Sequence, residues 1–324
     1  MKQYGIALHN YHDTNESFPA AKSQHPKIEP ASSDNWYAGW SCHFMLLPFM
    51  EETSRYVTLL QMDTTIMSNP CRIITTTQES YLLTPNTLRC PSDGNSKNYS
   101  FHNTDSQRRL PQCNIVLSHG DGMWDSERDY GSNPTIPAST NDNVSERGMF
   151  NCRLWKGMNA CNDGTSNTIA VSEAAVSQSE VNDTVLGGVR VFSSAFHNNA
   201  TTRLTCLNGR NGSMLTGTIA SNYLQRGASW MAGYICSNGF HTVHPPNTPN
   251  CTRYDGGFTG YGLYPPSAYH AGGVNTAYFD GSTHFISETI DFGFSTAIQV
   301  LSGESQFGVW GALGTPDGGE SKKL

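Results

Sequence analysis

A histidine followed by two glycines is the segment of this 324-residue sequence that most invites a catalytic interpretation. His270 is followed by Ala271, Gly272 and Gly273. Gly-rich loops of this kind supply the backbone N–H donors of the oxyanion hole in acyl-transfer enzymes. Such enzymes hold their nucleophile in a G-x-S-x-G turn, which this sequence does not contain. We therefore expect the two glycines to allow a close backbone approach before a β-hairpin.

A second pattern, H-x-x-H, is formed by His241 and His244. On a helix, this spacing places two imidazoles on one face, where they can share a metal ion. Pro245 and Pro246 follow directly and favour an extended chain, in which the two rings point to opposite faces. No glutamate completes a zinc-protease motif. The pattern therefore predicts no metal site at this pair.

Two Asp-Gly pairs, Asp163-Gly164 and Asp280-Gly281, are each followed by Thr or Ser. Carboxylates in such turns contribute to calcium sites, but those sites need several oxygen ligands at fixed spacing. That spacing is absent, and an Asp side chain commonly caps its own turn. These residues are therefore predicted to form structural turns. Together, the patterns predict no catalytic residue, no cofactor and no metal ion, and hence a protein that is not an enzyme.

The cysteines are dispersed and form no C-x-x-C pair, which argues against zinc-ribbon and thioredoxin-like sites. The nine residues are Cys42, Cys71, Cys90, Cys113, Cys152, Cys161, Cys206, Cys236 and Cys251. Short spacings favour disulfides between Cys152 and Cys161 and between Cys236 and Cys251, and disulfides indicate an oxidising compartment. The alternative is that these cysteines are buried thiols. The odd number leaves one cysteine over.

Charged residues make up only 15 % of the chain, below the usual ~25 %, and Ser, Thr, Asn and Gly take their place. This composition is typical of loop-rich β structure outside the cell. The formal net charge of -7 and the lack of a basic run argue against binding to nucleic acid or to an acidic membrane surface. The sequence shows neither an export signal nor an apolar run of about 18 residues. We therefore expect either a cytosolic protein or a chain that lacks its natural start.

The first 60 residues are predicted to be mainly helical. Residues 1–13 have the apolar spacing of a helix with one buried stripe, and this helix is expected to end between 15 and 19. The stripe comprises Tyr4, Ala7, Leu8 and Tyr11. Residues 39–60 form a second helical candidate, with Trp40, Phe44 and Leu47 on one side, which Pro48 should kink or restart.

Beyond residue 60 the sequence predicts short strands between loops. Strands are expected at 115–117, at 168–173 and near 187–196. The last two are predicted to pair as a hairpin or to be neighbours in one sheet. Residues 200–260 have the composition of a long polar insertion.

The strongest hairpin signal is Asp280-Gly281 between two strand-like runs, because both positions of a type I′ turn need positive φ. The predicted cross-strand pairs are Phe279–Ser282, Ala277–His284 and Asn275–Ile286. After the hairpin, a short helix is expected at 295–301. The Gly-rich tail at 307–320 is expected to be irregular.

Six segments carry a resemblance to a known family. They are MKQYGIALHNYHDTNESFPA, FMLLPFMEE, LRCPSD, DGTSNTIAVSE, YHAGGVNTAYFDGSTHFISETID and FGVWGALGTPDGGE, spread over nearly the whole chain. In this order they resemble a large prepilin-like family of unknown function that is abundant in planctomycetes. The most specific feature is a histidine, nine residues and then Asp-Gly, which His270, Asp280 and Gly281 reproduce.

The resemblance implies a pilin-like plan of the α+β class, in which an N-terminal helix packs on an antiparallel β-sheet with a large loop-rich β elaboration. It implies one domain, with 1–60 as the N-terminal helical segment, 61–324 as the β-rich part and the insertion near 200–260. Members usually begin with a prepilin leader and a hydrophobic helix that runs into a segment like residues 1–13. Met1 would then be an internal position, and the helix that anchors such proteins in the membrane would be missing from this chain.

The function that the resemblance implies is that of a structural subunit of an extracellular or cell-surface filament, either type IV pilin-like or pseudopilin-like. Its partners would be further copies of itself and other pilin-like subunits. One alternative is a surface-anchored module that binds glycans or other polymers through Trp36, Trp230 and Trp310, although their scattered positions favour a place in the core. The other is a secreted hydrolase with an unrecognised site.

Overall fold

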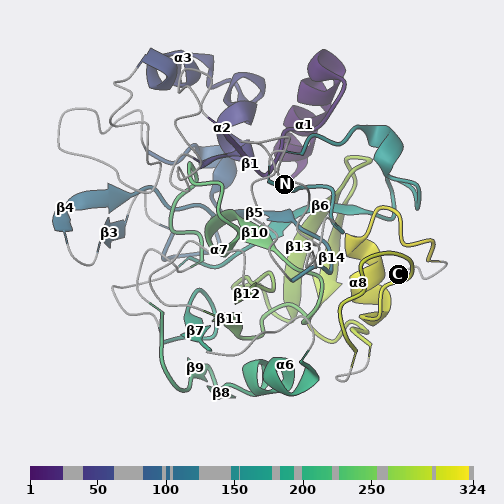
Figure 1. Cartoon of the computed structure of the whole chain (residues 1–324). Helices are drawn as coiled ribbons and strands as arrows, with labels where there is room; N and C mark the ends of the chain where they lie inside the picture. Colours follow the sequence, from purple (N-terminus) through teal and green to yellow (C-terminus); the bar gives the residue numbers. More distant parts are fainter. Residues whose placement is uncertain are drawn as a thin grey trace, which may run out of the picture.

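The computed structural model has the α+β architecture expected from the sequence, with helices and small sheets around one five-stranded sheet (Figure 1). It describes residues 1–24, 39–61, 83–96, 100–102, 105–123, 147–152, 154–176, 183–192, 199–220, 226–253, 262–293 and 297–320. For residues 100–102 and 105–110 only the backbone is described. Among the helices in these ranges, none has the length and apolar character needed to cross a membrane.

The five-stranded sheet, called the central sheet below, holds the strands that position the candidate site. In spatial order it contains β10 (Gly239–Phe240), β5 (Ile115–Ser118), β6 (Ile169–Glu173), β13 (Gly273–Tyr278) and β14 (Thr283–Ser287). All neighbours are antiparallel except β10 and β5, which run parallel. Every residue of β5 and β6 is buried, which confirms the strands predicted at 115–117 and 168–173.

Helices cover both faces of the central sheet. On β5, Leu117 belongs to the core cluster that contains Tyr4 of α1 (Lys2–Asn15), whereas Val116 belongs to the cluster that contains Trp310 of α8 (Gly308–Gly314). Because consecutive strand residues point to opposite faces, α1 and α8 lie on opposite sides of the sheet. This explains why β5 and β6 are apolar on both faces.

Helix α1 confirms the predicted N-terminal helix. Its buried side chains include Tyr4, Ala7 and Leu8, and Tyr11 is partly buried against the same cluster. Glu16 follows with φ 57 and ends the helix in the left-handed conformation. Gly5 packs against the loop between β13 and β14, since a Cβ added there would lie 3.7 Å from the Cα of Gly281. Helix α1 therefore lies against the loop end of the β13–β14 hairpin.

The second helical segment begins at Cys42 and not at 39, because Gly39–Ser41 with Trp40 forms strand β2; its division near Pro48 is as predicted. It comprises α2 (Cys42–Leu46), η1 (Leu47–Met50) and α3 (Thr53–Gln61). Ser41 caps α2, because its Oγ accepts a hydrogen bond from the Phe44 backbone N–H at 3.3 Å. Pro48 stands in the first turn of η1, where a missing N–H breaks no helical hydrogen bond.

The predicted pairing of strands 168–173 and 187–196 is wrong. β7 (Val189–Val191) lies in a separate three-stranded sheet, parallel to β11 (Asn250–Thr252), which also pairs with β12 (Gly262–Leu263). Val189 packs with Tyr234 and Tyr264 in a cluster distinct from the two that flank the central sheet. The polar insertion therefore supplies the partner strand of β7.

The remaining elements are two-stranded sheets and short helices. The sheets pair β1 (Lys22–Gln24) with β2 (Gly39–Ser41), β3 (Ser100–His102) with β4 (Asp105–Leu110), and β8 (Arg210–Asn211) with β9 (Met214–Leu215). The helices are η2 (Asn86–Leu88), η3 (Met158–Ala160), α6 (Ala200–Leu207) and α7 (Ile235–Asn238).

The prediction of an irregular C-terminal tail is wrong, because residues 308–314 form α8. Trp310 is fully buried, stacks on Phe240 with ring centroids 6.2 Å apart, and donates its indole N–H to the His244 carbonyl. Burial of this side chain outweighs the low helix propensity of glycine. The helix predicted at 295–301 is not seen at residues 297–301; residues 294–296 lie outside the described part of the chain.

The hairpin of β13 and β14 is present, but its predicted register is wrong. The observed partners include Asn275 with Phe285 and Thr276 with His284. The Tyr278 N–H bonds to the Ser282 carbonyl at 3.0 Å, which encloses a three-residue loop. Within it only Gly281 has positive φ, as in a type I turn followed by a left-handed residue. The wider loop shifts every predicted pair by one residue.

Candidate functional site

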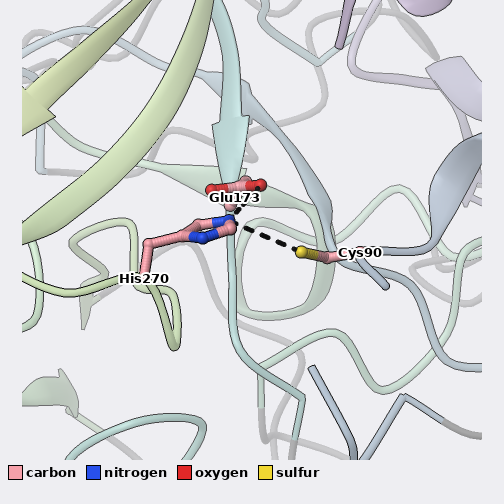
Figure 2. Close-up of side chains that lie close together, drawn as sticks. All are labelled: Cys90, Glu173 and His270. Atoms are coloured by element: carbon pink, nitrogen blue, oxygen red, sulfur yellow. Dashed lines mark hydrogen bonds and ion pairs between the residues drawn. The ribbon is translucent and has the colours of Figure 1, made fainter. Parts of the chain in front are cut away.

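Three side chains from distant parts of the sequence converge at the end of β6 (Figure 2). The Cys90 Sγ lies 3.7 Å from the His270 Nε2, and the same nitrogen lies 3.3 Å from the Glu173 Oε1. One ligand atom from each of the three residues lies within 4.8 Å of the others. The Glu173 side chain is 8 % exposed and that of His270 is 27 % exposed, so solvent reaches the group from the histidine side.

Glu173 is the last residue of β6 and is fixed by the neighbouring strand. The Asn275 backbone N–H donates to its Oε2 at 3.0 Å, and the Asn275 Nδ2 lies 3.2 Å from the same oxygen. Asn275 belongs to β13, which pairs with β6 in the central sheet. The carboxylate orientation is therefore set by two adjacent strands.

Cys90 is held beside Glu173 by a buried hydrogen-bond network. The Asn114 Oδ1 accepts the Cys90 backbone N–H at 2.9 Å, and the Asn114 Nδ2 donates to the Asp93 carboxylate at 2.7 Å and to the Ala174 carbonyl at 3.0 Å. The same Asp93 oxygen accepts the Val176 N–H at 3.0 Å. The turn that carries Cys90 is thus bound to the residues directly after β6.

His270 lies in the segment that leads into β13. This segment is also tied to the end of β6, because the Ser267 N–H bonds to the Glu173 carbonyl at 2.9 Å and the Ser267 Oγ accepts the Ala175 N–H at 3.1 Å. The hydroxyl of Tyr269 accepts a hydrogen bond from the Asn95 Nδ2 at 2.9 Å. His270 therefore lies in a loop that is hydrogen-bonded both to the end of β6 and to Asn95 in the turn that follows Cys90.

The arrangement differs from that of an activated thiol nucleophile. A Cys-His-acid relay places the thiol and the acid on opposite imidazole nitrogens, whereas both contacts here are made to Nε2. Burial and the nearby negative charge of Glu173 raise the pKa of the Cys90 thiol. In this state the thiol is protonated at neutral pH. The geometry instead resembles three ligands directed at a common point.

The two glycines after His270 serve the hairpin. Gly272 has φ +82, and a Cβ added at Gly273 would collide with the carbonyl oxygen of Ile286 on β14. The Glu288 N–H bonds to the Gly272 carbonyl at 2.9 Å. Their backbone therefore passes too close to β14 for a side chain at Gly273, in keeping with the close approach expected from the sequence.

The two Asp-Gly pairs lie in turns. The Asp280 Oδ1 accepts the Ser282 N–H at 2.8 Å inside the hairpin loop. The Asp163 carboxylate accepts the N–H groups of Gly318 and Gly319 at 2.6 and 3.0 Å, and Gly164 has φ +102. Asp163 thus also holds the chain that follows α8.

The disulfide pairing differs from both predicted pairs. Cys251 is bonded to Cys206 and not to Cys236, and Cys152 and Cys161 are not bonded to each other. Cys206 of α6 and Cys251 of β11 belong to one core cluster, whereas Cys236 of α7 belongs to another. Packing therefore decides the pairing, and proximity in the sequence does not. Cys71 lies outside the described residues.

The two imidazoles of the H-x-x-H pair lie in the protein interior. His241 and His244 are buried, and burial lowers the pKa of both, to about 3 for His244. His241 stacks on Tyr264 with ring centroids 6.0 Å apart. Among the residues that the structure describes, only Cys90, Glu173 and His270 form a set of metal-ligating side chains.

A second feature with functional potential is the open edge of the central sheet at β14. Hydrogen bonds from Tyr278 to Ser282 and from Glu288 to Gly272 direct the even-numbered residues of this stretch toward β13. Because bonding alternates in antiparallel pairs, the backbone groups of Thr283, Phe285 and Ser287 point to the open side. The Phe285 side chain is 51 % exposed, and no strand of the described residues pairs with this edge.

Sequence reasoning singled out His270 but not Cys90 or Glu173 as its partners. Each of the three stands in a different segment of the resemblance, namely LRCPSD, DGTSNTIAVSE and YHAGGVN. The sequence does not show that these segments meet in space, so the group could not be predicted from it. No curated protein and no solved structure matches the chain. Residues 1–293 match the family described as proteins of unknown function DUF1559, and the chain therefore belongs to that family.

Proposed function

We propose that the chain is a structural subunit of an extracellular pilin-like or pseudopilin-like assembly and that it acts by self-association. The observation that carries the proposal is the packing of α1, which buries one side against the central sheet at the loop end of the β13–β14 hairpin (Figure 1). The rings of Phe18, just after α1, and Phe279 in that loop lie 4.8 Å apart. A helix packed on an antiparallel sheet is the plan that the sequence resemblance implies for such subunits.

Two further features support the proposal. The open edge of β14 offers unpaired backbone groups and an exposed aromatic side chain to a second copy, and soluble proteins usually protect such edges. The disulfide between Cys206 and Cys251 fits an oxidising compartment. Neither feature requires a bound substrate.

The proposal predicts that β14 takes part in assembly. Phe285→Lys places a charge on the open edge, which disfavours strand pairing between copies. We expect this variant to be produced and folded but missing from filaments sheared from the surface of the native cells and viewed by electron microscopy. Val57→Lys on α3 is the matched control, because Val57 is 44 % exposed and α3 lies well away from β14 in Figure 1. This control should assemble as the wild type does.

Mass spectrometry of the same sheared material gives the native N-terminus, which the proposal places upstream of residue 1, on a hydrophobic helix. Wild-type protein recovered only as a soluble monomer, with residue 1 as its mature N-terminus, contradicts the proposal. Equal assembly of Phe285→Lys and Val57→Lys would show that β14 is not the contact surface.

An aromatic binding platform is not proposed. Trp230 and Trp310 are fully buried, as their scattered positions suggested, and Trp36 lies outside the described residues. Neither of the two buried rings can stack on a glycan at the surface.

A further inference from the structure

We propose that Cys90, Glu173 and His270 together bind one divalent transition-metal ion, with zinc as the ion that fits the ligand set best. This site is independent of the assembly proposed above. It rests on the distances within the group, on the atoms that converge and on the hydrogen bonds that hold the three residues.

The distances match those of a tetrahedral site. Zinc binds Cys sulfur at ~2.3 Å and His nitrogen or carboxylate oxygen at ~2.0–2.2 Å, so ligand atoms at tetrahedral angles lie about 3.5 Å apart for S···N and about 3.3 Å apart for N···O. The observed separations are 3.7 Å for the Cys90 Sγ and His270 Nε2, and 3.3 Å for the His270 Nε2 and Glu173 Oε1. The third pair, the Cys90 sulfur and a Glu173 oxygen, lies within 4.8 Å, and an ion bound to both would draw the sulfur closer.

The ligand atoms of the three side chains face one another. Figure 2 shows the thiol, the carboxylate and the imidazole edge directed at one another from three separate segments. Both the sulfur and the carboxylate oxygen lie near the same imidazole nitrogen. An ion at the centre would turn two long contacts into three metal–ligand bonds.

Outer hydrogen bonds orient the ligands, as metal sites require. Asn275 binds Oε2 of Glu173 through its backbone N–H and its side chain, and the same side-chain nitrogen lies 3.5 Å from Oε1, the oxygen that contacts the histidine. Asn114 fixes the backbone of Cys90. The positions of two ligands are therefore set before any ion arrives, which lowers the entropic cost of binding.

The ligand types select the ion. Thiolate and imidazole are soft or borderline ligands that suit zinc and its neighbours, whereas calcium and magnesium need several oxygen ligands. The described residues supply three ligands, and the histidine side of the group is open to solvent. Water can therefore complete a four-coordinate zinc site.

The test uses the purified full-length chain, stripped with a chelator, then titrated with Zn²⁺ and with Co²⁺ as a spectroscopic substitute. We expect one ion per chain, a thiolate-to-cobalt charge-transfer band in the near ultraviolet and the visible absorption of four-coordinate Co²⁺. Cys90→Ser should abolish the charge-transfer band. Glu173→Gln and His270→Ala should weaken zinc binding by at least about 100-fold, since loss of an outer contact alone typically costs 10–100-fold.

The controls are Cys161→Ser and His284→Ala, which remove a thiol and an imidazole away from the site. Both should keep wild-type stoichiometry, affinity and spectrum. Far-ultraviolet circular dichroism checks the fold of each variant. If the other variants fold poorly, Glu173→Gln still tests the site, because the amide has the shape of the carboxylate and its oxygen can accept the same hydrogen bonds. Absence of zinc binding by the wild type would overturn the proposal, and so would equal weakening by the site and control variants. Either result leaves the assembly experiment unaffected.

Discussion

The side chain of Asn114 is 1 % exposed, and its amide satisfies three polar groups around the Cys90 turn. These are the Cys90 N–H, the Asp93 carboxylate and the Ala174 carbonyl. A buried polar group that loses its partner costs about 1–3 kcal/mol of unfolding free energy. At this scale, one amide connects β5 to the turn of Cys90 and to the end of β6.

Asn114→Ala is expected to lower the unfolding free energy by about 2–4 kcal/mol, because it leaves the partly buried Cys90 N–H and the buried Ala174 carbonyl without their partner. Equilibrium unfolding in urea measures the change. Asn95→Ala is the matched control in the same turn: its side chain makes one exposed hydrogen bond to Tyr269, so a loss below about 1 kcal/mol is expected. Similar losses for the two variants would disprove the special role of Asn114.

The candidate site shows what sequence can and cannot predict about individual residues. His270 stood out because of the glycines that follow it, and Gly273 was assigned to close packing for the correct physical reason. Cys90 and Glu173 carry no local signal, since a cysteine before proline and a glutamate ending a strand are ordinary. Their relation to His270 depends on the order of strands in the central sheet, which local spacing does not determine.

At the scale of elements, the disulfide joins α6 to β11 and closes a loop of 45 residues. Both cysteines are fully buried, so a reductant reaches the bond once the chain opens on heating. The cross-link stabilises chiefly by restricting the unfolded chain.

Replacing Cys206 and Cys251 with Ala is expected to lower the unfolding free energy by about 4 kcal/mol, the value that the chain-entropy treatment gives for this loop length. Thermal melts of both proteins, with and without reductant, test this contribution of the disulfide. Reductant should lower the melting temperature of the wild type and leave that of the double variant unchanged. A wild-type melt that does not respond to reductant would argue against a structural disulfide.

Elements with local signals were predicted well, and those set by tertiary packing were not. The stripe of α1 and the break at Pro48 follow from side-chain spacing and from the missing proline N–H. The hairpin was recognised from Asp280-Gly281. Its loop, however, has three residues, because Phe279 lies in the loop and not in β13. This shifts the register of the two strands by one residue. Helix α8 could not be predicted, because the burial of Trp310 beneath the central sheet overrides the local preference of its glycines.

At the scale of the whole molecule, four histidines among the described residues are buried: His43, His119, His241 and His244. Burial lowers the pKa of His43, His119 and His244 from 6.5 to about 3, and it also lowers the pKa of His241 well below 6.5. These imidazoles are therefore neutral in the folded protein and accept protons once the chain unfolds. Because the unfolded state binds more protons below pH 6.5, stability is fully present above this pH and is lost as the pH falls toward 3.

We expect the unfolding free energy to fall steadily between pH 6.5 and pH 5, with each histidine contributing up to about 1.4 kcal/mol per pH unit at the lower end. Urea unfolding across this range gives the slope. His244→Asn should remove the contribution of one histidine from this slope. A slope of zero in the wild type would be inconsistent with buried neutral histidines.

The separation of Cys90 and His270 along the chain, 180 residues, also sets an order in time. At usual rates of synthesis, roughly 10 to 40 seconds pass between the addition of the first and of the second. The end of β6 is made about halfway through this interval, but the histidine loop is missing until its end, and until then the thiol stays available to other sulfurs and oxidants. The nascent chain therefore passes through a period of vulnerability that ends only when β13 joins the sheet.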